Sequence, residues 1–358
     1  MSARALIMAG GTGGHIFPAL AVAKFLQERG VSVTWLGTKT GLEAELIPKA
    51  GIEIDWITIG GIRGKGLLGW IMAPIRILKA VAQAASIISI RKPDVVLGMG
   101  GFATGPGGIA AWLKGKPLVI HEQNSIAGLT NRLLSRFSSK VLLAFPAAIR
   151  SDKAVVTGNP LRQEFSQVAA PEVRNTPRRV ALNILVVGGS LGAKALNEVV
   201  PKALSLIPLE RRPTVRHQCG KKNFDETVAL YRELGVKAEI SPFIEDVIEA
   251  YTWADLVICR AGALTVSELA AVGVASILVP FPHAVDDHQT TNGKYLVDGS
   301  AAILIQQNIL TPELLLKTLE DLTDRPEKVK EMAINARKLA KTNATELVAK
   351  FCLEYAHV

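Results

Sequence analysis

The chain has 358 residues, of which 49% are hydrophobic and 20% charged, and it carries a net charge of +9. This length and composition exclude a disordered chain and suit a soluble globular protein with two domains of common size. Three cysteines without a CxxC pair argue against a disulfide framework or a structural zinc site, and they fit a reducing cytoplasm.

Short apolar runs bounded by glycine alternate with helical patterns along the first half of the chain. No cleavable signal peptide is expected, because the first apolar run is short and continues into a glycine-rich loop. A helix is predicted over Ile16–Arg29, where Leu20, Ala23, Phe25 and Leu26 form an inward stripe. The predicted strands are Arg4–Ala9, Val31–Leu36, Ile52–Ile59, Asp94–Met99, Pro117–His121 and Lys140–Phe145. Strands that alternate with helices indicate a doubly wound parallel sheet.

The second half of the chain restarts this pattern after a turn at Gly158–Pro160. Its predicted strands are Asn183–Val187, Thr214–Gln218, Lys237–Ile240, Leu256–Cys259, Ser276–Val279 and Ala302–Ile305. We therefore expect an N-terminal domain over residues 1–160 and a C-terminal domain over residues 161–341. The helix over residues 342–358 is expected to pack back on the N-terminal domain.

A weak internal repeat supports this division. The stretches ALIMAGGTGGH (residues 5–15) and ILVVGGSLGAK (residues 184–194) both place an apolar strand, two glycines and a hydroxyl residue before a helix. Two such domains facing a cleft would direct the carboxyl ends of both sheets into it, and open α/β sheets bind ligands at those ends.

The glycine loops alone suit several ligands, because bare backbone at a helix start can approach an anion or a sugar. A P-loop is excluded because Lys194 lies between two alanines and lacks the required spacing. A dinucleotide fingerprint is disfavoured, since Ile16 occupies the third glycine position and no acid ends the second strand. Ser190 can donate to a phosphate oxygen, but a helix N-cap is a comparable interpretation.

Seven motifs occur in order along the chain: GGTGGH, GMGGF, HEQN, GNPLR, GGSLGA, AGALTVSE and DDHQ. Together they resemble the bacterial UDP-N-acetylglucosamine:lipid I N-acetylglucosaminyltransferases, which form lipid II in peptidoglycan synthesis. The resemblance covers essentially the whole chain and implies a GT-B fold. It also implies an inverting reaction, in which the muramoyl 4-hydroxyl of lipid I attacks C1 of the sugar and UDP leaves.

This reaction needs a base for the hydroxyl and stabilisation of the charge on the leaving diphosphate. His15 follows a glycine loop at a helix start, so it is the leading candidate for the base, with a role in binding sugar or diphosphate as an equal alternative. His121 and Glu122, at the end of a strand, are the reserve candidates. The resemblance also places Thr12, Gly13, Gly14 and Asn124 around the donor sugar and the acceptor.

The resemblance assigns the donor-binding residues to the C-terminal half and its entry. Arg162 and Ser190 would meet the diphosphate, and Ile244 would read uracil through its backbone. Gln289 would hold the hydroxyls of N-acetylglucosamine, and Glu268 would accept from the ribose, although a helix-dipole partner is the alternative for that carboxylate. The helix start beneath the diphosphate consists of Ala263, Leu264, Thr265, Val266, Ser267 and Glu268.

No metal or other cofactor is expected in the site. The chain contains no Asp-x-Asp sequence, which metal-dependent sugar transferases commonly use. The stretch Asp286-Asp287-His288 is the one cluster that suggests a metal, and adjacent acids at a predicted helix start are better explained as cap and surface groups. Leu191 stands where relatives also have glutamine, a change that leaves the glycine loop intact.

Positive charge is concentrated in residues 1–160, with 18 Lys and Arg against 8 Asp and Glu, and this excess indicates an anionic partner or only a solubilising surface. Trp56–Pro93 contains no acid, and its apolar run Leu67–Ile75 is too short to span a bilayer but fits docking on anionic lipid. A core helix is the alternative for part of this stretch. Sparse aromatic residues that do not interleave with the cations disfavour nucleic acid.

Together with the acid-free stretch Trp56–Pro93, the resemblance implies a peripheral location on the cytoplasmic face of the bacterial plasma membrane, with cell-wall assembly proteins as possible partners. Two rival functions stay open from the residues. A UDP-sugar 2-epimerase would share the two-domain architecture but would not need the acid-free apolar stretch. A non-catalytic membrane scaffold would use the basic half alone.

Overall fold

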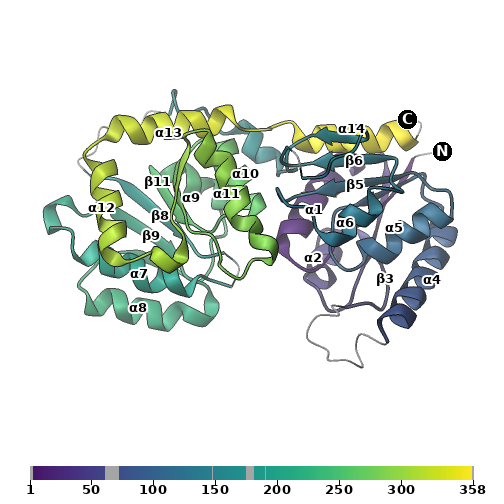
Figure 1. Cartoon of the computed structure of the whole chain (residues 1–358), viewed down its shortest axis with the longest axis horizontal. Coiled ribbons are helices and arrows are strands. Elements are labelled where there is room, and N and C mark those ends of the chain that lie inside the picture. The colour runs from purple at the N-terminus through teal and green to yellow at the C-terminus, as the bar shows by residue number, and fades with distance from the viewer. Residues whose placement is uncertain (1–2, 61–71, 147, 175–180, 190, 357–358) are drawn as a thin grey trace. The chain divides into compact units, whose positions relative to one another are not determined.

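The computed structural model describes residues 3–60, 72–146, 148–174, 181–189 and 191–356, and Figure 1 shows the chain. The chain divides into two compact units. Unit 1 comprises Met1–Gln163 and Thr342–Val358, and unit 2 comprises Glu164–Lys341. The C-terminal helix α14 (Ala344–Ala356) thus belongs to the same unit as the N-terminal strand.

Unit 1 contains a seven-stranded parallel sheet in the order β3-β2-β1-β4-β5-β6-β7. Its strands are β1 (Arg4–Met8), β2 (Ser32–Gly37), β3 (Glu53–Trp56), β4 (Val95–Gly98), β5 (Leu118–Glu122), β6 (Lys140–Leu143) and β7 (Ala154–Val156). The strand order reverses between β1 and β4, and the crevice at such a switch point is where doubly wound sheets bind ligands.

Helices cover both faces of this sheet, because the strand residues are apolar on both sides. One face packs against α1 (Gly13–Gln27), α2 (Glu43–Lys49) and α14, with Ile7 and Trp35 fully buried beneath them. The other face packs against α4 (Ala73–Arg91), α5 (Thr104–Leu113) and α6 (Leu129–Leu134). In Figure 1, α14 lies along unit 1 in yellow.

Unit 2 contains a six-stranded parallel sheet in the order β10-β9-β8-β11-β12-β13. Its strands are β8 (Asn183–Val187), β9 (Thr214–Gln218), β10 (Glu239–Ser241), β11 (Leu256–Cys259), β12 (Ala275–Leu278) and β13 (Ala302–Leu304). The order reverses between β8 and β11, which gives this unit a switch point of its own.

The helices of unit 2 are α7 (Lys194–Ser205), α8 (Phe224–Glu233), α9 (Val247–Trp253), α10 (Ala263–Val272), α11 (His288–Asp298), α12 (Pro312–Thr323) and α13 (Pro326–Lys338). Short 3-10 turns occupy Gln163–Gln167, Leu209–Arg211, Lys221–Asn223, Val285–Asp287 and Gln307–Ile309. One face of the sheet buries a core with α7, α8, α12 and α13. Helix α10 packs against α9, α11 and α13.

The strands agree closely with the apolar runs, and three of them, β8, β9 and β11, have the predicted bounds. One predicted strand was too long, and one strand was not predicted. The run Ile52–Ile59 forms a strand only over Glu53–Trp56, because its sole partner β2 ends at Gly37 opposite Trp56. Strand β7 was missed, since its three residues form an edge strand too short to produce a pattern.

Candidate active site

Two glycine loops meet at the switch point of unit 1. The first joins β1 to α1, with Gly11 at a φ of 89° and the exposed Thr12 at the N-cap position. The second joins β4 to α5, and a Cβ on its Gly101 would lie 2.3 Å from the carbonyl oxygen of Gly10. The two backbones therefore touch directly, an approach that only glycine permits at this position.

His15 lies against the second loop. It stands in the first turn of α1, where its N–H donates to the carbonyl of Thr12 at 3.1 Å, and its side chain is partly exposed. A Cβ on Gly100 would lie 2.8 Å from the imidazole Cδ2, so the ring lies over the Gly100 backbone. The structure thus places His15, Gly13 and Gly14 beyond the carboxyl ends of the paired strands β1 and β4, at the switch point of the sheet.

His121 and Glu122 end β5, and both are buried. The His121 Nε2 lies 2.9 Å from the Gly158 carbonyl oxygen, and burial lowers the pKa of the imidazole to about 4. At neutral pH the ring is therefore neutral, with Nε2–H donating to that carbonyl. This hydrogen bond joins β5 to Gly158, in the segment that follows β7.

The carboxylate of Glu122 organises the loop that follows β5. It accepts hydrogen bonds from the backbone N–H of Asn124 at 3.0 Å and of Gly128 at 3.1 Å, and from Asn131 Nδ2 at 2.9 Å. Asn124 is thus anchored through its backbone at the edge of the sheet that also carries His15.

The third glycine loop leaves β8 in unit 2. Gly189 and Gly192 have φ values of 84° and 77°, and a Cβ on Gly192 would lie 2.0 Å from the Cys219 carbonyl oxygen. Gln218 braces this loop, since its side chain accepts from Gly189 N–H and donates to Pro242 O, both at 3.1 Å. Ser190, the predicted phosphate donor, lies outside the described residues.

A buried polar chain lies behind this loop. His217 contacts Tyr231 Oη at 2.9 Å through Nδ1 and Asn197 Oδ1 at 3.0 Å through Nε2. Asn197 Nδ2 in turn donates to the Cys219 carbonyl at 3.0 Å. Burial lowers the pKa of His217 to about 3, so the ring is neutral and donates through Nε2–H to Asn197. This chain connects α8 and α7 to the backbone that Gly192 contacts.

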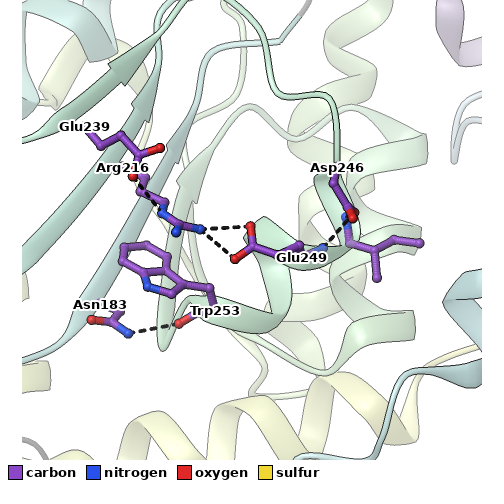
Figure 2. A network of polar contacts seen from close by, with 7 residues as sticks. Asn183, Arg216, Glu239, Asp246, Glu249 and Trp253 are labelled. Atoms are coloured by element: carbon purple, nitrogen blue, oxygen red, sulfur yellow. Dashed lines mark hydrogen bonds and ion pairs between the residues drawn. The ribbon is translucent and has the colours of Figure 1, made fainter.

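Ile244 lies in the loop between β10 and α9, and an ionic cluster supports that loop (Figure 2). Arg216 contacts Glu239 at 3.1 Å and Glu249 at 2.9 Å, and its guanidinium carbon lies 4.3 Å from the Trp253 ring centroid. Asp246 caps α9 by accepting from the N–H groups of residues 248 and 249. The cluster therefore joins β9, β10 and α9 around the segment that carries Ile244.

Helix α10 begins at the carboxyl end of β11 with Ala263, after Gly262 in extended conformation. Its first turn carries no acidic residue, so its positive end can face an anion. Glu268, one turn further on, accepts a hydrogen bond from Tyr251 Oη at 3.3 Å. Leu264, Thr265 and Ser267 are partly exposed and Val266 is buried in the core.

Gln289 lies in the first turn of α11, beyond the carboxyl end of β12. Its Oε1 accepts from the Phe281 N–H at 2.9 Å. Four predicted donor-binding features of unit 2 thus follow the carboxyl ends of its strands. They are the glycine loop after β8, Ile244 after β10, the start of α10 after β11 and Gln289 after β12. Because the strands are parallel, all four lie at the same edge of the sheet.

Arg162 is exposed and belongs to unit 1, because the division between the units falls after Gln163. Asp286 and Asp287 have left-handed backbone with φ of 54° and 49°, and Asp287 Oδ1 accepts from the Thr290 hydroxyl at 2.7 Å. Within the described ranges, no group of three His, Cys, Asp or Glu side chains is suitably placed to hold a metal ion.

The sequence did not indicate three of the residues that shape these loops. Tyr251 and Asn131 lie in the short helices α9 and α6, and their hydrogen-bond partners become visible only in the fold. Glu43 is fully buried, and its carboxylate contacts the first glycine loop. The only available signal was its setting in the glycine-rich stretch Gly37–Glu43, which resembles an ordinary turn.

Two doubly wound parallel sheets with glycine loops at their switch points form the GT-B fold, which many nucleotide-sugar glycosyltransferases adopt. The model of the glycosyltransferase family 28 N-terminal domain matches residues 5–143, and that of its C-terminal domain matches residues 183–349. The chain therefore belongs to glycosyltransferase family 28.

Relatives that match nearly the whole chain carry the name of a transferase. A UDP-N-acetylglucosamine–N-acetylmuramyl-(pentapeptide) pyrophosphoryl-undecaprenol N-acetylglucosamine transferase of Marinobacter nauticus is 56% identical over 99% of this chain and 98% of its own. The transferase of that name from Cupriavidus metallidurans is 54% identical over 99% of both chains. The crystal structure of Acinetobacter baumannii MurG matches with a TM-score of 0.86 and 45% identity, over 98% of this chain and 99% of that one.

The architecture is shared more widely. A UDP-N-acetylglucosamine 2-epimerase matches with a TM-score of 0.67 at 13% identity, over 100% of this chain and 98% of the epimerase. At that identity the likeness shows the fold alone. The transferase relatives and the epimerase are thus separated by sequence and not by architecture.

Proposed function

We propose that this protein transfers N-acetylglucosamine from UDP-N-acetylglucosamine to lipid I, N-acetylmuramyl-(pentapeptide) pyrophosphoryl-undecaprenol, and so forms lipid II for peptidoglycan. The observation that carries this proposal is the identity of 56% and 54% with transferases of that name over nearly the whole chain. The muramoyl 4-hydroxyl attacks C1 of the sugar from the face opposite the diphosphate, so one displacement inverts the anomeric centre.

Unit 2 is the donor-binding unit in this proposal. The glycine loop after β8 and the start of α10 present backbone N–H groups and a positive helix end to the diphosphate. Glu268 accepts from the ribose hydroxyls, and Ile244 binds uracil through its backbone. Because Gln289 Oε1 already accepts from Phe281, its NH2 group is the part that donates to the sugar hydroxyls.

Unit 1 is the acceptor-binding unit, and His15 is its general base. The ring is partly exposed at the switch point, and histidine is the side chain that enzymes use most often as a general base. His121 is a poorer base because burial lowers its pKa to about 4. We assign Glu122 to holding the loop that carries Asn124 and His121 to joining β5 to Gly158, while Thr12, Gly13 and Gly14 contact the sugars.

The charge that develops on the leaving diphosphate is neutralised without a metal ion in this proposal. The groups that do so are the start of α10, the permanently charged guanidinium of Arg162 and the hydroxyl of Ser190. Fixed dipoles and donors of this kind stabilise a transition state without reorganising, which is the main electrostatic contribution in many enzymes.

We further propose that unit 1 docks on anionic lipid at the cytoplasmic face of the plasma membrane. Helix α4 alone, among the described helices, has the length and composition to cross a bilayer. However, one face of α4 is buried in the core of unit 1 through Ala80, Ala84 and Ile88, so α4 covers the sheet and does not span a membrane in this proposal. The exposed residues of α4 contact lipid instead.

The docking surface comprises exposed apolar and basic side chains on α4 and α5. Ile75 and Leu78 are 58% and 67% exposed, and Trp112 on α5 is 51% exposed. Arg76 and Lys79 are exposed beside them. Apolar side chains between cations suit an interface with anionic headgroups. Residues 67–71 of the predicted apolar run, and Arg63 and Lys65, lie outside the described residues.

Incubation with labelled UDP-N-acetylglucosamine and a lipid I analogue in EDTA tests the reaction. Transfer of label to the lipid, with release of UDP, is the expected result. Isomerisation of the sugar nucleotide without an acceptor would instead select the epimerase, and transfer that EDTA abolishes would overturn the metal-free site.

Flotation with phosphatidylglycerol vesicles tests the docking surface. The double variant Ile75→Ser, Leu78→Ser should bind the vesicles at least fivefold more weakly, because it removes buried apolar area at the interface. Leu209→Ser, at a residue 76% exposed on unit 2, is the matched control and should bind like the parent. Equal binding of all three proteins would contradict the proposed surface.

A further inference from the structure

Glu43 is an acidic residue in the interior of unit 1. It begins α2, and its side chain is fully buried. Its Oε2 accepts from the Gly11 N–H at 2.9 Å, and its Oε1 accepts from the N–H of Thr38 at 3.1 Å and from the Thr38 hydroxyl at 2.7 Å. The carboxylate therefore ties the β1–α1 loop to the end of β2, across 32 residues of sequence.

Three glycines enclose this carboxylate. A Cβ on Gly41 would lie 1.9 Å from Glu43 Oε2, and one on Gly10 would lie 2.5 Å from Oε1. A Cβ on Gly37 would lie 2.9 Å from Cγ of the same side chain. The backbone of two segments, the β1–α1 loop and the connection from Gly37 to Gly41, is thus shaped around one acidic side chain. A buried carboxylate that only maintained the fold would be costly compared with an apolar residue of similar size.

The position of Glu43 has a functional meaning in a doubly wound sheet. The loop after the first strand normally presents its N–H groups to the phosphate of a bound nucleotide. In unit 1 the Gly11 N–H is taken by a carboxylate of the protein itself. The carboxylate also places negative charge behind the loop, which opposes binding of a second anion there.

We propose that Glu43 is a positioning residue for sugar transfer, an internal anion that locks the β1–α1 loop in place of a bound phosphate. This inference rests on the proposed function, in which the same loop leads into Thr12 and His15. With its N–H held by Glu43, Gly11 keeps the left-handed backbone that starts α1, and the imidazole keeps its place over Gly100. A nucleotide phosphate is then directed to unit 2, where the neutral side chain of Gln218 contacts the glycine loop after β8.

The test is Glu43→Gln, which keeps the shape but replaces one acceptor oxygen by an NH2 group that opposes the N–H of Gly11 or Thr38. We expect kcat to fall at least tenfold at a temperature well below Tm, while KM for UDP-N-acetylglucosamine stays within twofold. Thr38→Val removes one of the three donors and should lower kcat about threefold, which provides the measurement should Glu43→Gln fail to fold.

Two controls separate positioning from stability. Ile47→Ala removes core packing from the same helix without changing the loop. It should lower Tm at least as much as Glu43→Gln does, while its kcat stays within twofold of the parent value. Glu45→Gln makes the same chemical change at an exposed residue of α2 and should leave both unchanged. Parent-like kcat in folded Glu43→Gln or Thr38→Val would overturn the inference, as would an equal loss in Ile47→Ala. An inactive parent protein would instead count against the proposed function.

Discussion

The hydroxyl of Tyr251 donates a hydrogen bond to Glu268 Oε2 at 3.3 Å, which joins α9 to α10 inside unit 2. Tyr251 is 1% exposed, and burial together with the neighbouring Glu268 raises the pKa of its phenol well above the usual value. The phenol is therefore a permanent donor, and it holds the carboxylate that we assign to the ribose.

Tyr251→Phe should weaken donor binding with little effect on turnover. The change removes one hydrogen bond to a charged group, about 1.5 kcal/mol, which corresponds to a KM for UDP-N-acetylglucosamine raised about tenfold. Steady-state kinetics at saturating acceptor measure the effect. A kcat that falls while KM stays constant would show that Tyr251 acts on the transition state instead.

His15→Ala should lower kcat by about 10² to 10⁴, the range that a positioned general base contributes, with donor affinity little changed. His15→Gln separates the two roles left open for this residue, because glutamine can donate a hydrogen bond but cannot accept a proton from the hydroxyl. Recovery of activity in the glutamine variant would favour binding over base catalysis. Calorimetric titration with UDP checks that both variants bind the nucleotide.

Unit 2 should lose stability in mild acid because of His217. Its folded pKa of about 3 lies below the usual 6.5, so the unfolded chain binds the additional proton. His217 contributes to the free energy of unfolding above pH 6.5, and this contribution is lost as the pH falls. The loss is about 2 kcal/mol between pH 6.5 and 5. Urea unfolding at both pH values should show a smaller difference for His217→Gln. An unchanged difference would mean that other groups cause the loss.

Arg216→Lys should loosen the loop that carries Ile244. Lysine cannot contact Glu239 and Glu249 together as a planar fork, so the stability should fall by about 1 kcal/mol. KM for UDP-N-acetylglucosamine should rise about threefold at constant kcat. Arg211→Lys, in an exposed pair with Asp324, is the matched control and should change neither quantity. An equal KM for UDP-N-acetylglucosamine in both variants would show that the Arg216 cluster does not contribute to donor binding.

Local patterns accounted for much of the architecture. The apolar runs that became β8, β9 and β11 are short and bounded by turn residues, so their extent depends mainly on nearby sequence. The edge strands β3 and β7 were less predictable, because the length of an edge strand depends on its single partner. The paired glycine motifs likewise predicted two sheets, since a strand followed by glycines and a helix is a local signal.

The sequence by itself determined the two parallel sheets, the glycine loops and the family, because these depend on short-range periodicity and on motifs in fixed order. Only the tertiary structure decided which side chains the loops rely on. Glu43 contacts Gly11 because β2 pairs beside β1, and His121 is a poor base because β5 is buried within the sheet. Burial and hydrogen bonding between segments distant in sequence arise from strand order, which no local pattern encodes.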